Sequence, residues 1–266
     1  MTLGLRLATR RTFLLGGSAL FASACSRTRS RGEAVPNLKH RALDSLPTTT
    51  LSWLTLRDHF VATVGARAGE GHPLGSLLVL ADATFSPRSR FPLHPHREME
   101  ILSIVLNGDL SHHGDQAHGA TVSARSAQLI SARDGMVHAE GNDTDAPTRM
   151  LQIWFEPTSR GGTPAYFHRS FAERGRHLLA GDAEMPLRAD ARVWWHDLEP
   201  GTIERLSTAP QRRGYLLAMT SPLHVVAAGD PARAIRLEMG EGLVVEGGAV
   251  DLSADIAGAA LWLDIA

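Results

Sequence analysis

The sequence predicts an all-β fold, and three observations support this expectation. Short runs of apolar or alternating residues recur from Thr48 onward. Turn-forming pairs such as Asn-Gly, Gly-Asp and Gly-Gly separate these runs, as they commonly separate strands. No long stretch repeats its apolar residues with the period of a helix, and residues 57–66 are the one place where a helix would fit. Many short strands with such spacing are typical of a β-sandwich or a β-barrel.

The expected strands form two groups, and a charged segment separates them. The run from Arg169 to Asp190 has little apolar pattern, so we interpret it as the connection between two β domains. These domains would cover residues 48–172 and 173–266. The strands of the first group are expected at residues 74–85, 99–113, 121–131 and 149–157, and those of the second at 215–221, 223–229, 234–252 and 259–266.

The start of the chain, residues 1–24, has the composition of a targeting segment. It carries basic residues, Arg10 and Arg11 among them, together with an apolar stretch and no acidic residue. The apolar stretch is too short to cross the hydrocarbon core of a bilayer, about 30 Å, as a helix. Thr9 to Leu14 look like the twin-arginine export consensus. The sequence therefore predicts a twin-arginine signal peptide over residues 1–24, export by the twin-arginine translocase, and a periplasmic or otherwise extracytoplasmic location.

Cys25, the one cysteine in the sequence, directly follows this segment. Ala22-Ser23-Ala24 fits the small-x-small cleavage rule, so ordinary cleavage would leave Cys25 at the new N-terminus. A lipoprotein signal would instead acylate Cys25 and anchor the protein by a lipid. Both readings stay open. Residues 25–47 show little apolar periodicity and are expected to form an exposed linker.

Charge and motif content argue against several classes of function. The formal net charge is −1, the sequence pI is about 6.9, and no basic stripe is present. These values give no electrostatic reason to expect a nucleic-acid partner. The sequence also lacks a Gly-x-Ser-x-Gly elbow, a phosphate-binding loop and a dinucleotide fingerprint. Among the possible classes of function, a site for a small molecule or a metal is therefore the better hypothesis.

A histidine pair, His94-Pro95-His96, opens the first candidate motif. Side chains two apart in a strand share a face, so both imidazoles point the same way, and Glu98 and Glu100 follow if the strand stays regular. Proline has no N–H, so Pro95 indicates an edge strand or the start of a strand. Taken alone, the pair could also be an exposed strand face.

His138 and Glu140 form the second candidate motif, because they too share a strand face. With His94 and His96 they would supply three imidazoles and one carboxylate from two strands. Such a mixed nitrogen and oxygen site suits Fe, Mn, Ni, Cu or Zn.

A further polar cluster comprises His112-His113, Asp115 and His118. It fits either a second metal site or a solvated loop at the mouth of a barrel. Residues 180–266 hold only two histidines, which lie far apart in the sequence. We therefore expect no catalytic metal in the second domain.

The two motifs together resemble the two-part cupin signature, and their residues are most similar to the form of that signature found in the pirin family. HPHREMEI, with Gly108 after the following strand, resembles the first pirin motif, and GMVHAEGN resembles the second. The resemblance covers residues 50–172 specifically and the remainder in outline. It implies two cupin barrels, of the double-stranded β-helix or jelly-roll type: a metal-binding domain at 48–172 and a domain without metal ligands at 173–266. Three further stretches also look like pirin: Ser52-Trp53 with His59-Phe60, Leu151-Gln152-Ile153-Trp154, and Thr163-Pro164-Ala165-Tyr166.

This resemblance implies that His94, His96, His138 and Glu140 ligate one divalent transition metal. Iron is the leading candidate, and Mn, Ni, Cu and Zn are the alternatives. Glu100 stands where many other cupins have a metal-ligating glutamate, so it is the second choice as a ligand or a partner that orients an imidazole. Two features depart from the family pattern: the loop 123–126 lacks the expected Pro-x-Gly turn, and many pirin-like proteins lack an export signal.

The implied activity is that of a quercetin 2,3-dioxygenase, which opens a flavonol or related polyphenol with O2. Glu140 would act both as a ligand and as the catalytic base. Two alternatives stay open. The protein could be a metal-dependent binding or regulatory module without turnover, or a cupin enzyme of another class, such as an isomerase or an oxygenase of another enolic or phenolic compound.

Overall fold

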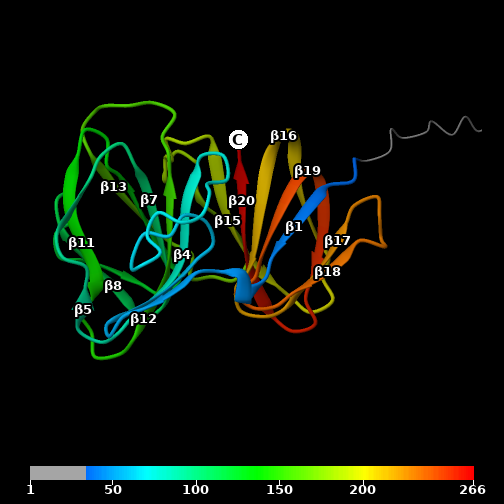
Figure 1. Ribbon diagram of the computed structural model, residues 1–266, viewed down its shortest axis with the longest axis horizontal. Helices are drawn as coiled ribbons and strands as arrows, with labels where there is room; N and C mark the ends of the chain where they lie inside the picture. Colours follow the sequence, from blue (N-terminus) through cyan, green and yellow to red (C-terminus); the bar gives the residue numbers. More distant parts are fainter. Residues whose placement is uncertain (1–33) are drawn as a thin grey trace, which may run out of the picture. The chain divides into compact units, whose positions relative to one another are not determined.

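The regular secondary structure of the described chain, residues 34–266, consists almost entirely of antiparallel β-sheets in the computed structural model (Figure 1). The predicted all-β class is therefore confirmed. The single helical element that the structure describes is a short 3-10 turn, η1 (Leu43–Ser45), and no helix in the described part of the chain is long and apolar enough to cross a membrane. The predicted signal peptide and Cys25 lie outside the described residues.

Two sheets that face each other form the first barrel, on the left in Figure 1. Their inner faces enclose an apolar core that includes Leu54, Phe85, Val105 and Leu110. The larger sheet has the order β13 (Ala165–Ser170), β10 (Ser126–Ser131), β7 (Glu100–Asn107), β12 (Thr148–Phe155), β4 (Leu77–Phe85), β3 (Leu54–Asp58) and β2 (Thr48–Thr50). The smaller has the order β5 (Ser89–Arg90), β11 (Met136–Asn142), β8 (Asp109–Gly114) and β9 (Ala120–Ser123), and β6 (His94–His96) also pairs with β11.

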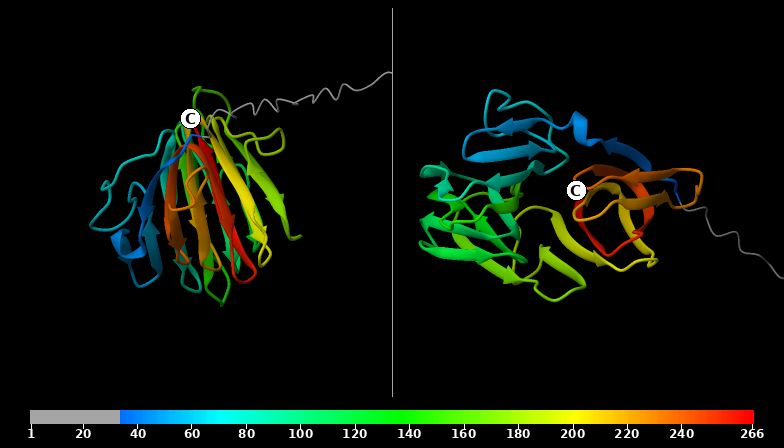
Figure 2. Two further views of the ribbon diagram at one scale, coloured as in Figure 1. Left: turned by 90° about the vertical axis from the view of Figure 1, so that its right-hand side faces the viewer. Right: turned by 90° about the horizontal axis from the view of Figure 1, so that it is seen from below.

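One eight-stranded sheet curls into the second barrel, which the right-hand view of Figure 2 shows end-on in yellow to red. Its interior packs around residues such as Leu206, Leu216, Val225 and Leu243. The strand order is β14 (Arg176–Ala180), β15 (Ala191–Leu198), β20 (Gly258–Ile265), β16 (Glu204–Ala218), β19 (Gly242–Ser253), β17 (Leu223–Ala227) and β18 (Ala234–Leu237), and β1 (Asn37–Arg41) pairs with β19.

A shared apolar cluster joins the two barrels. It contains Leu102 and Ile104 of β7 together with Val193 of β15 and Leu263 of β20. β7 is buried on both faces, which explains why its sequence, EILSIVLN, is almost continuously apolar instead of alternating.

Arg125 replaces the turn motif that the pirin pattern led us to expect at 123–126. Its backbone adopts φ +58, so the chain turns there without proline or glycine. Its guanidinium group contacts both carboxylate oxygens of Asp197, at 3.0 and 2.7 Å, and lies 5.0 Å from the ring centre of Phe171. The turn residue therefore also ties the first barrel to the second.

We predicted an exposed linker over residues 25–47, but part of this segment is folded and contains strand β1. β1 pairs with β19 over five residues, from Asn37 opposite Glu246 to Arg41 opposite Gly242. Leu38 packs against the core of the second barrel. An edge strand is held mainly by backbone hydrogen bonds, so its sequence needs few apolar residues, and the composition of this segment gave no strand signal.

Residues 57–66, where a helix would have fitted, contain the end of β3 and an irregular loop. Val61 and Val64 of this loop pack against the core of the first barrel. Gly65 follows with φ +81, a conformation that does not continue a right-handed helix. The expectation of a helix was wrong because tertiary packing places these apolar residues.

His59 and Tyr215 form a buried hydrogen bond between the barrels. His59 Nδ1 lies 2.6 Å from the Tyr215 hydroxyl, and both side chains are inaccessible to solvent. The second ring nitrogen, Nε2, is also buried and has no partner among the described residues. Burial therefore lowers the pKa of His59 to about 3, although the charge of Asp82 acts in the opposite direction.

We expect acid to destabilise the fold partly through His59. The unfolded chain takes up a proton on this residue near pH 6.5, whereas the folded chain does so only near pH 3, so stability is lost as the pH falls from 6.5 toward 3. His59→Gln keeps a hydrogen-bonding side chain that does not titrate. In urea unfolding, the parent should lose about 1–2 kcal/mol more than this variant between pH 7 and pH 5. Equal losses would show that His59 does not set the acid response.

Candidate metal centre

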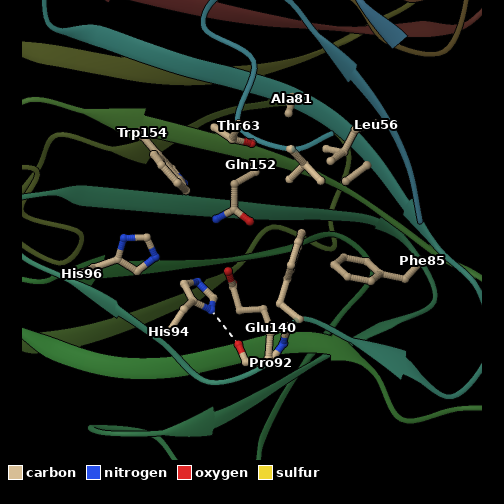
Figure 3. Close-up of a pocket in the computed structure, with 13 residues that line it drawn as sticks. Leu56, Thr63, Ala81, Phe85, Pro92, His94, His96, Glu140, Gln152 and Trp154 are labelled. Carbon is tan, nitrogen blue, oxygen red and sulfur yellow. Dashed lines mark hydrogen bonds between the residues drawn. The ribbon is translucent and has the colours of Figure 1, made fainter. Parts of the chain in front are cut away.

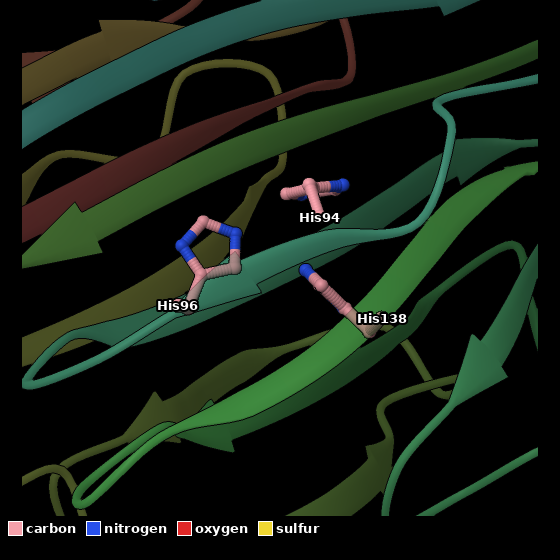
Figure 4. A group of neighbouring side chains, drawn as sticks. All are labelled: His94, His96 and His138. Atoms are coloured by element: carbon pink, nitrogen blue, oxygen red, sulfur yellow. The ribbon is translucent and has the colours of Figure 1, made fainter.

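Strand pairing brings the two predicted motifs together. β6 pairs with β11 in such a register that His94 lies opposite His138, and His96 lies opposite Met136. Residues that face each other in an antiparallel pair point to the same side, so the three imidazoles converge (Figure 4). One nitrogen of each ring lies within 4.8 Å of the others. Pro95 lies in a short strand with a partner on one side only, as its missing N–H predicted.

His138 has the environment of a metal ligand. The residue is fully buried, yet neither Nδ1 nor Nε2 has a hydrogen-bond partner in the described part of the chain. Burial, with smaller effects from His94 and His112, lowers the pKa of His138 to about 3. A neutral imidazole with two free nitrogens in a barrel interior is costly, and a metal would satisfy one of them.

His94 and His96 complete the group from the facing strand. His94 Nδ1 lies 2.8 Å from the carbonyl oxygen of Pro92, and because a carbonyl only accepts, this nitrogen carries the proton and leaves Nε2 free. Burial lowers the pKa of His96 to about 4, with further contributions from His138 and His94. A divalent metal requires neutral imidazole ligands, and the lowered pKa values of His96 and His138 meet this requirement.

Glu140 enters the barrel on the same face, two residues after His138 on β11. Its Oε1 accepts a hydrogen bond from the hydroxyl of Ser103 at 2.7 Å and another from Gln128 Nε2. Its Oε2 has no hydrogen-bond partner among residues 34–266. Figure 3 shows the side chain beside His94. Glu140 lies outside the 4.8 Å group of nitrogens but borders the same cavity, so its role as a fourth ligand remains a proposal.

The other two glutamates of the first motif do not share this face, which corrects the expectation from a regular strand. β6 ends at His96, and Glu98 adopts φ +50. That kink carries the chain from the smaller sheet into β7 of the larger one. Glu100 consequently accepts hydrogen bonds from Ser131 at 2.5 Å and from the backbone N–H of Arg188 at 3.2 Å, and it has no hydrogen bond to an imidazole among the described residues. It is neither a ligand in this arrangement nor a partner that orients one.

A cavity of about 290 Å³ lies beside the imidazoles (Figure 3). Its wall is mainly apolar, and the polar groups gather around His94, His96 and Glu140. A mainly apolar pocket with a few convergent polar groups is typical of a site for a small organic ligand. The lining residues are Leu56, Thr63, Val64, Ala81, Ala83, Phe85, Phe91, Pro92, His94, His96, Glu140, Gln152 and Trp154.

Strand alternation divides the polar cluster around His112-His113. His112 is buried inside the barrel, with its ring centre 5.3 Å from that of His138 and its Nε2 3.1 Å from the carbonyl oxygen of Asp115. His113 points to the other side of the strand and bonds Asp143 at 2.7 Å. Within residues 34–266, the only group of potential ligands close enough to hold a metal is the triad of His94, His96 and His138. The structure therefore does not assemble a second site here.

Sequence reasoning missed the polar residues that face Glu140 from the larger sheet. Ser103, Gln128 and Gln152 lie in β7, β10 and β12, each within an otherwise apolar run. That isolation is a usable signal, because a polar side chain on a buried strand must find a hydrogen-bond partner. The identity of the partner, however, depends on strand pairing that a local pattern does not encode.

Comparison with known proteins gives consistent results. The family model of pirin matches residues 40–155. A pirin-like protein of Caulobacter vibrioides is 31% identical over 197 residues, which cover 71% of this chain and 84% of the relative. A Pseudomonas aeruginosa protein, provisionally named a quercetin 2,3-dioxygenase, is 33% identical over 217 residues, 78% of this chain and 90% of the relative. The crystal structure of a bacterial pirin, YhhW of Escherichia coli in complex with nickel(II), has the same fold, with a TM-score of 0.77 at 23% identity over 86% of this chain and 99% of that one.

Proposed function

The chain belongs to the pirin family of two-barrel cupins, and on this premise we propose that it is a metal-dependent oxygenase that opens a flavonol or a related polyphenol with O2. The observation that supports this most strongly is the triad of imidazoles beside a mainly apolar cavity, in which the fully buried His138 has no hydrogen-bond partner on either ring nitrogen among the described residues. The names of relatives, which include quercetin 2,3-dioxygenase, support the reaction class.

The residues that would hold the metal are His94, His96, His138 and Glu140. Iron is our leading candidate, and the nickel(II) complex of YhhW supports a divalent metal in this fold. When bound, such a metal would act as a Lewis acid that lowers the pKa of a phenolic or enolic hydroxyl and would provide the redox chemistry for O2. Three neutral imidazoles and one carboxylate leave part of its charge uncompensated, which favours an anionic substrate.

The chain itself would bind, orient and deprotonate the substrate. Phe85, Phe91 and Trp154 supply aromatic walls that suit a planar ring. Glu140 Oε2, which has no partner in the described residues, would accept the proton of the hydroxyl. Ser103 and Gln128 hold the other carboxylate oxygen and so fix the direction in which Oε2 points.

Incubating the iron-loaded protein with a panel of flavonols under O2 tests this function. Ring opening should consume O2 and release carbon monoxide in equal amounts, and protein loaded with redox-inert Zn²⁺ should serve as the control. If the iron-loaded protein consumes no O2 with any flavonol, the oxygenase function is wrong and a binding module without turnover becomes the better account.

We also propose that the protein is exported in the folded state, on the strength of the twin-arginine motif in residues 9–14. Folded export would allow the metal to be loaded before the chain meets a different metal pool. Replacing Arg10 and Arg11 together with lysine should keep the precursor in the cytoplasm, as cell fractionation and immunoblotting would show. Unchanged export of this double variant, beside an Arg6→Lys control, would argue against the twin-arginine route.

A further inference from the structure

Ser103, Gln128 and Gln152 form one polar row across the inner face of the larger sheet. In the strand register, Ser103 lies opposite Gln128 on one side and opposite Gln152 on the other. Cross-strand neighbours point to the same side, so the three side chains face the interior together. Glu140 reaches this row from β11 of the smaller sheet.

The contacts within the row have only one consistent direction. A carboxylate only accepts hydrogen bonds, so the single hydroxyl proton of Ser103 goes to Glu140 Oε1, at 2.7 Å. Ser103 Oγ can then only accept, and the amide group 3.3 Å away must be Gln152 Nε2. Gln128 likewise presents Nε2 to Glu140, and that same nitrogen lies 3.4 Å from Ser103 Oγ. The hydrogen bonds therefore run from Gln152, which donates to Ser103, to Glu140, which accepts from Ser103.

This direction determines what Gln152 presents to the cavity. Its Nε2 is engaged by Ser103, whereas its Oε1 has no partner among the described residues and is not sealed from solvent. Gln152 lines the cavity, and Figure 3 shows its amide on the wall across from His94 and Glu140. An unpaired acceptor on a mainly apolar wall discriminates strongly, because an occupant without a donor leaves it unsatisfied.

We infer that Ser103 is a positioning residue for Glu140, and that Gln152, which donates to Ser103 Oγ, recognises a hydroxyl group of the substrate through its Oε1. The substrate class is then a ring compound with at least one hydroxyl in addition to the group that Glu140 deprotonates. The nature of the occupant rests on the proposed function, whereas the positioning of Glu140 rests on the hydrogen bonds alone. A merely structural network would stabilise the barrel without affecting metal release or ligand preference, so those two properties are the ones to measure.

The first experiment measures how Ser103 holds Glu140. Parent, Ser103→Ala and Ser103→Thr proteins are loaded with Co²⁺, and the visible spectrum and the rate of Co²⁺ transfer to a chelator are recorded. Ser103→Ala should alter the spectrum and weaken metal binding by about 10–100-fold, the usual effect of losing a group that orients a ligand. Ser103→Thr retains the hydroxyl and should behave as the parent. An unchanged spectrum and transfer rate in Ser103→Ala would overturn the positioning role.

The second experiment measures recognition without turnover. Co²⁺-loaded parent and Gln152→Leu proteins are titrated anaerobically with quercetin and with 3-hydroxyflavone, which lacks the additional hydroxyl groups. Gln152→Leu should bind quercetin about 5–10-fold more weakly and 3-hydroxyflavone unchanged, as expected for one lost hydrogen bond. Equal binding of quercetin by both proteins, or an equal loss for both ligands, would overturn the recognition role.

The outcomes separate this inference from the proposed function. Selective loss of quercetin binding in Gln152→Leu, combined with no O2 uptake by the iron-loaded parent, would refute the oxygenase function and support the inference. O2 uptake by the iron-loaded parent, combined with unchanged quercetin binding in Gln152→Leu, would support the oxygenase function and refute the recognition role of Gln152. If the parent binds neither compound, both the function and the recognition role of Gln152 fail, and the Co²⁺ experiment alone decides the positioning role of Ser103.

Discussion

The His138→Ala protein should lose nearly all of its bound transition metal. His138 is the most buried member of the triad, and both of its ring nitrogens are unpartnered in the described structure. Removing it would leave His94 and His96 on one strand, with no imidazole opposite them on β11. Loss of a ligand should cost more than the about 10–100-fold in affinity that loss of a supporting group costs. Elemental analysis after dialysis against a metal buffer measures the change.

His113→Ala is the matched control for this experiment. His113 lies on the neighbouring strand β8, but it points away from the triad and bonds Asp143. Its removal deletes an imidazole of the same region without touching the proposed ligands, so metal content should stay at the level of the parent. If His138→Ala retained as much metal as His113→Ala, the ligand assignment would be wrong.

Glu140→Gln should reduce turnover far more than it reduces metal content. The three imidazoles remain to hold the metal, and the amide keeps the size of the side chain and one oxygen that can bind the metal or accept a hydrogen bond. It cannot accept a proton, however, and loss of a general base typically costs about 10²–10⁴-fold in rate. The initial rate of O2 uptake with flavonol and the metal content should be measured on the same preparation.

Glu100→Gln provides the comparison for the Glu140 variant. Glu100 is an equally buried glutamate of the same barrel, but it bonds Ser131 and the backbone of Arg188 instead of facing the imidazoles. Its replacement should leave kcat close to that of the parent. If Glu140→Gln turned over flavonol as fast as the parent, the base role of Glu140 would be refuted.

Local spacing was sufficient to predict the core of the site. His94 and His96 share a face because they are two apart in a strand, and the same rule places His138 and Glu140 together on β11. The same rule failed at Glu98, where φ +50 ends the strand and sends the chain to another sheet. A single backbone kink of this kind has no reliable local signature, so Glu100 was wrongly placed near the metal.

The rest of the site depends on which strands become neighbours. Ser103 contacts Glu140 although 37 residues separate them, and Arg125 contacts Asp197 across 72 residues. Periodicity gives the face on which a side chain lies but not its partner across the barrel. The prediction of a linker at β1 failed for the same reason. This strand exists because it pairs with β19, and paired residues such as Asn37 and Glu246 lie more than two hundred residues apart in the sequence.

Anomalous X-ray diffraction from crystals of the metal-loaded protein tests the central claim most directly. Data collected at the absorption edge of the bound metal should show one peak in the first barrel, about 2.1 Å from a nitrogen of each of His94, His96 and His138 and about as close to Glu140 Oε2. A peak elsewhere, or a peak on the three imidazoles with Glu140 still turned only toward Ser103 and Gln128, would contradict the proposed four-residue centre.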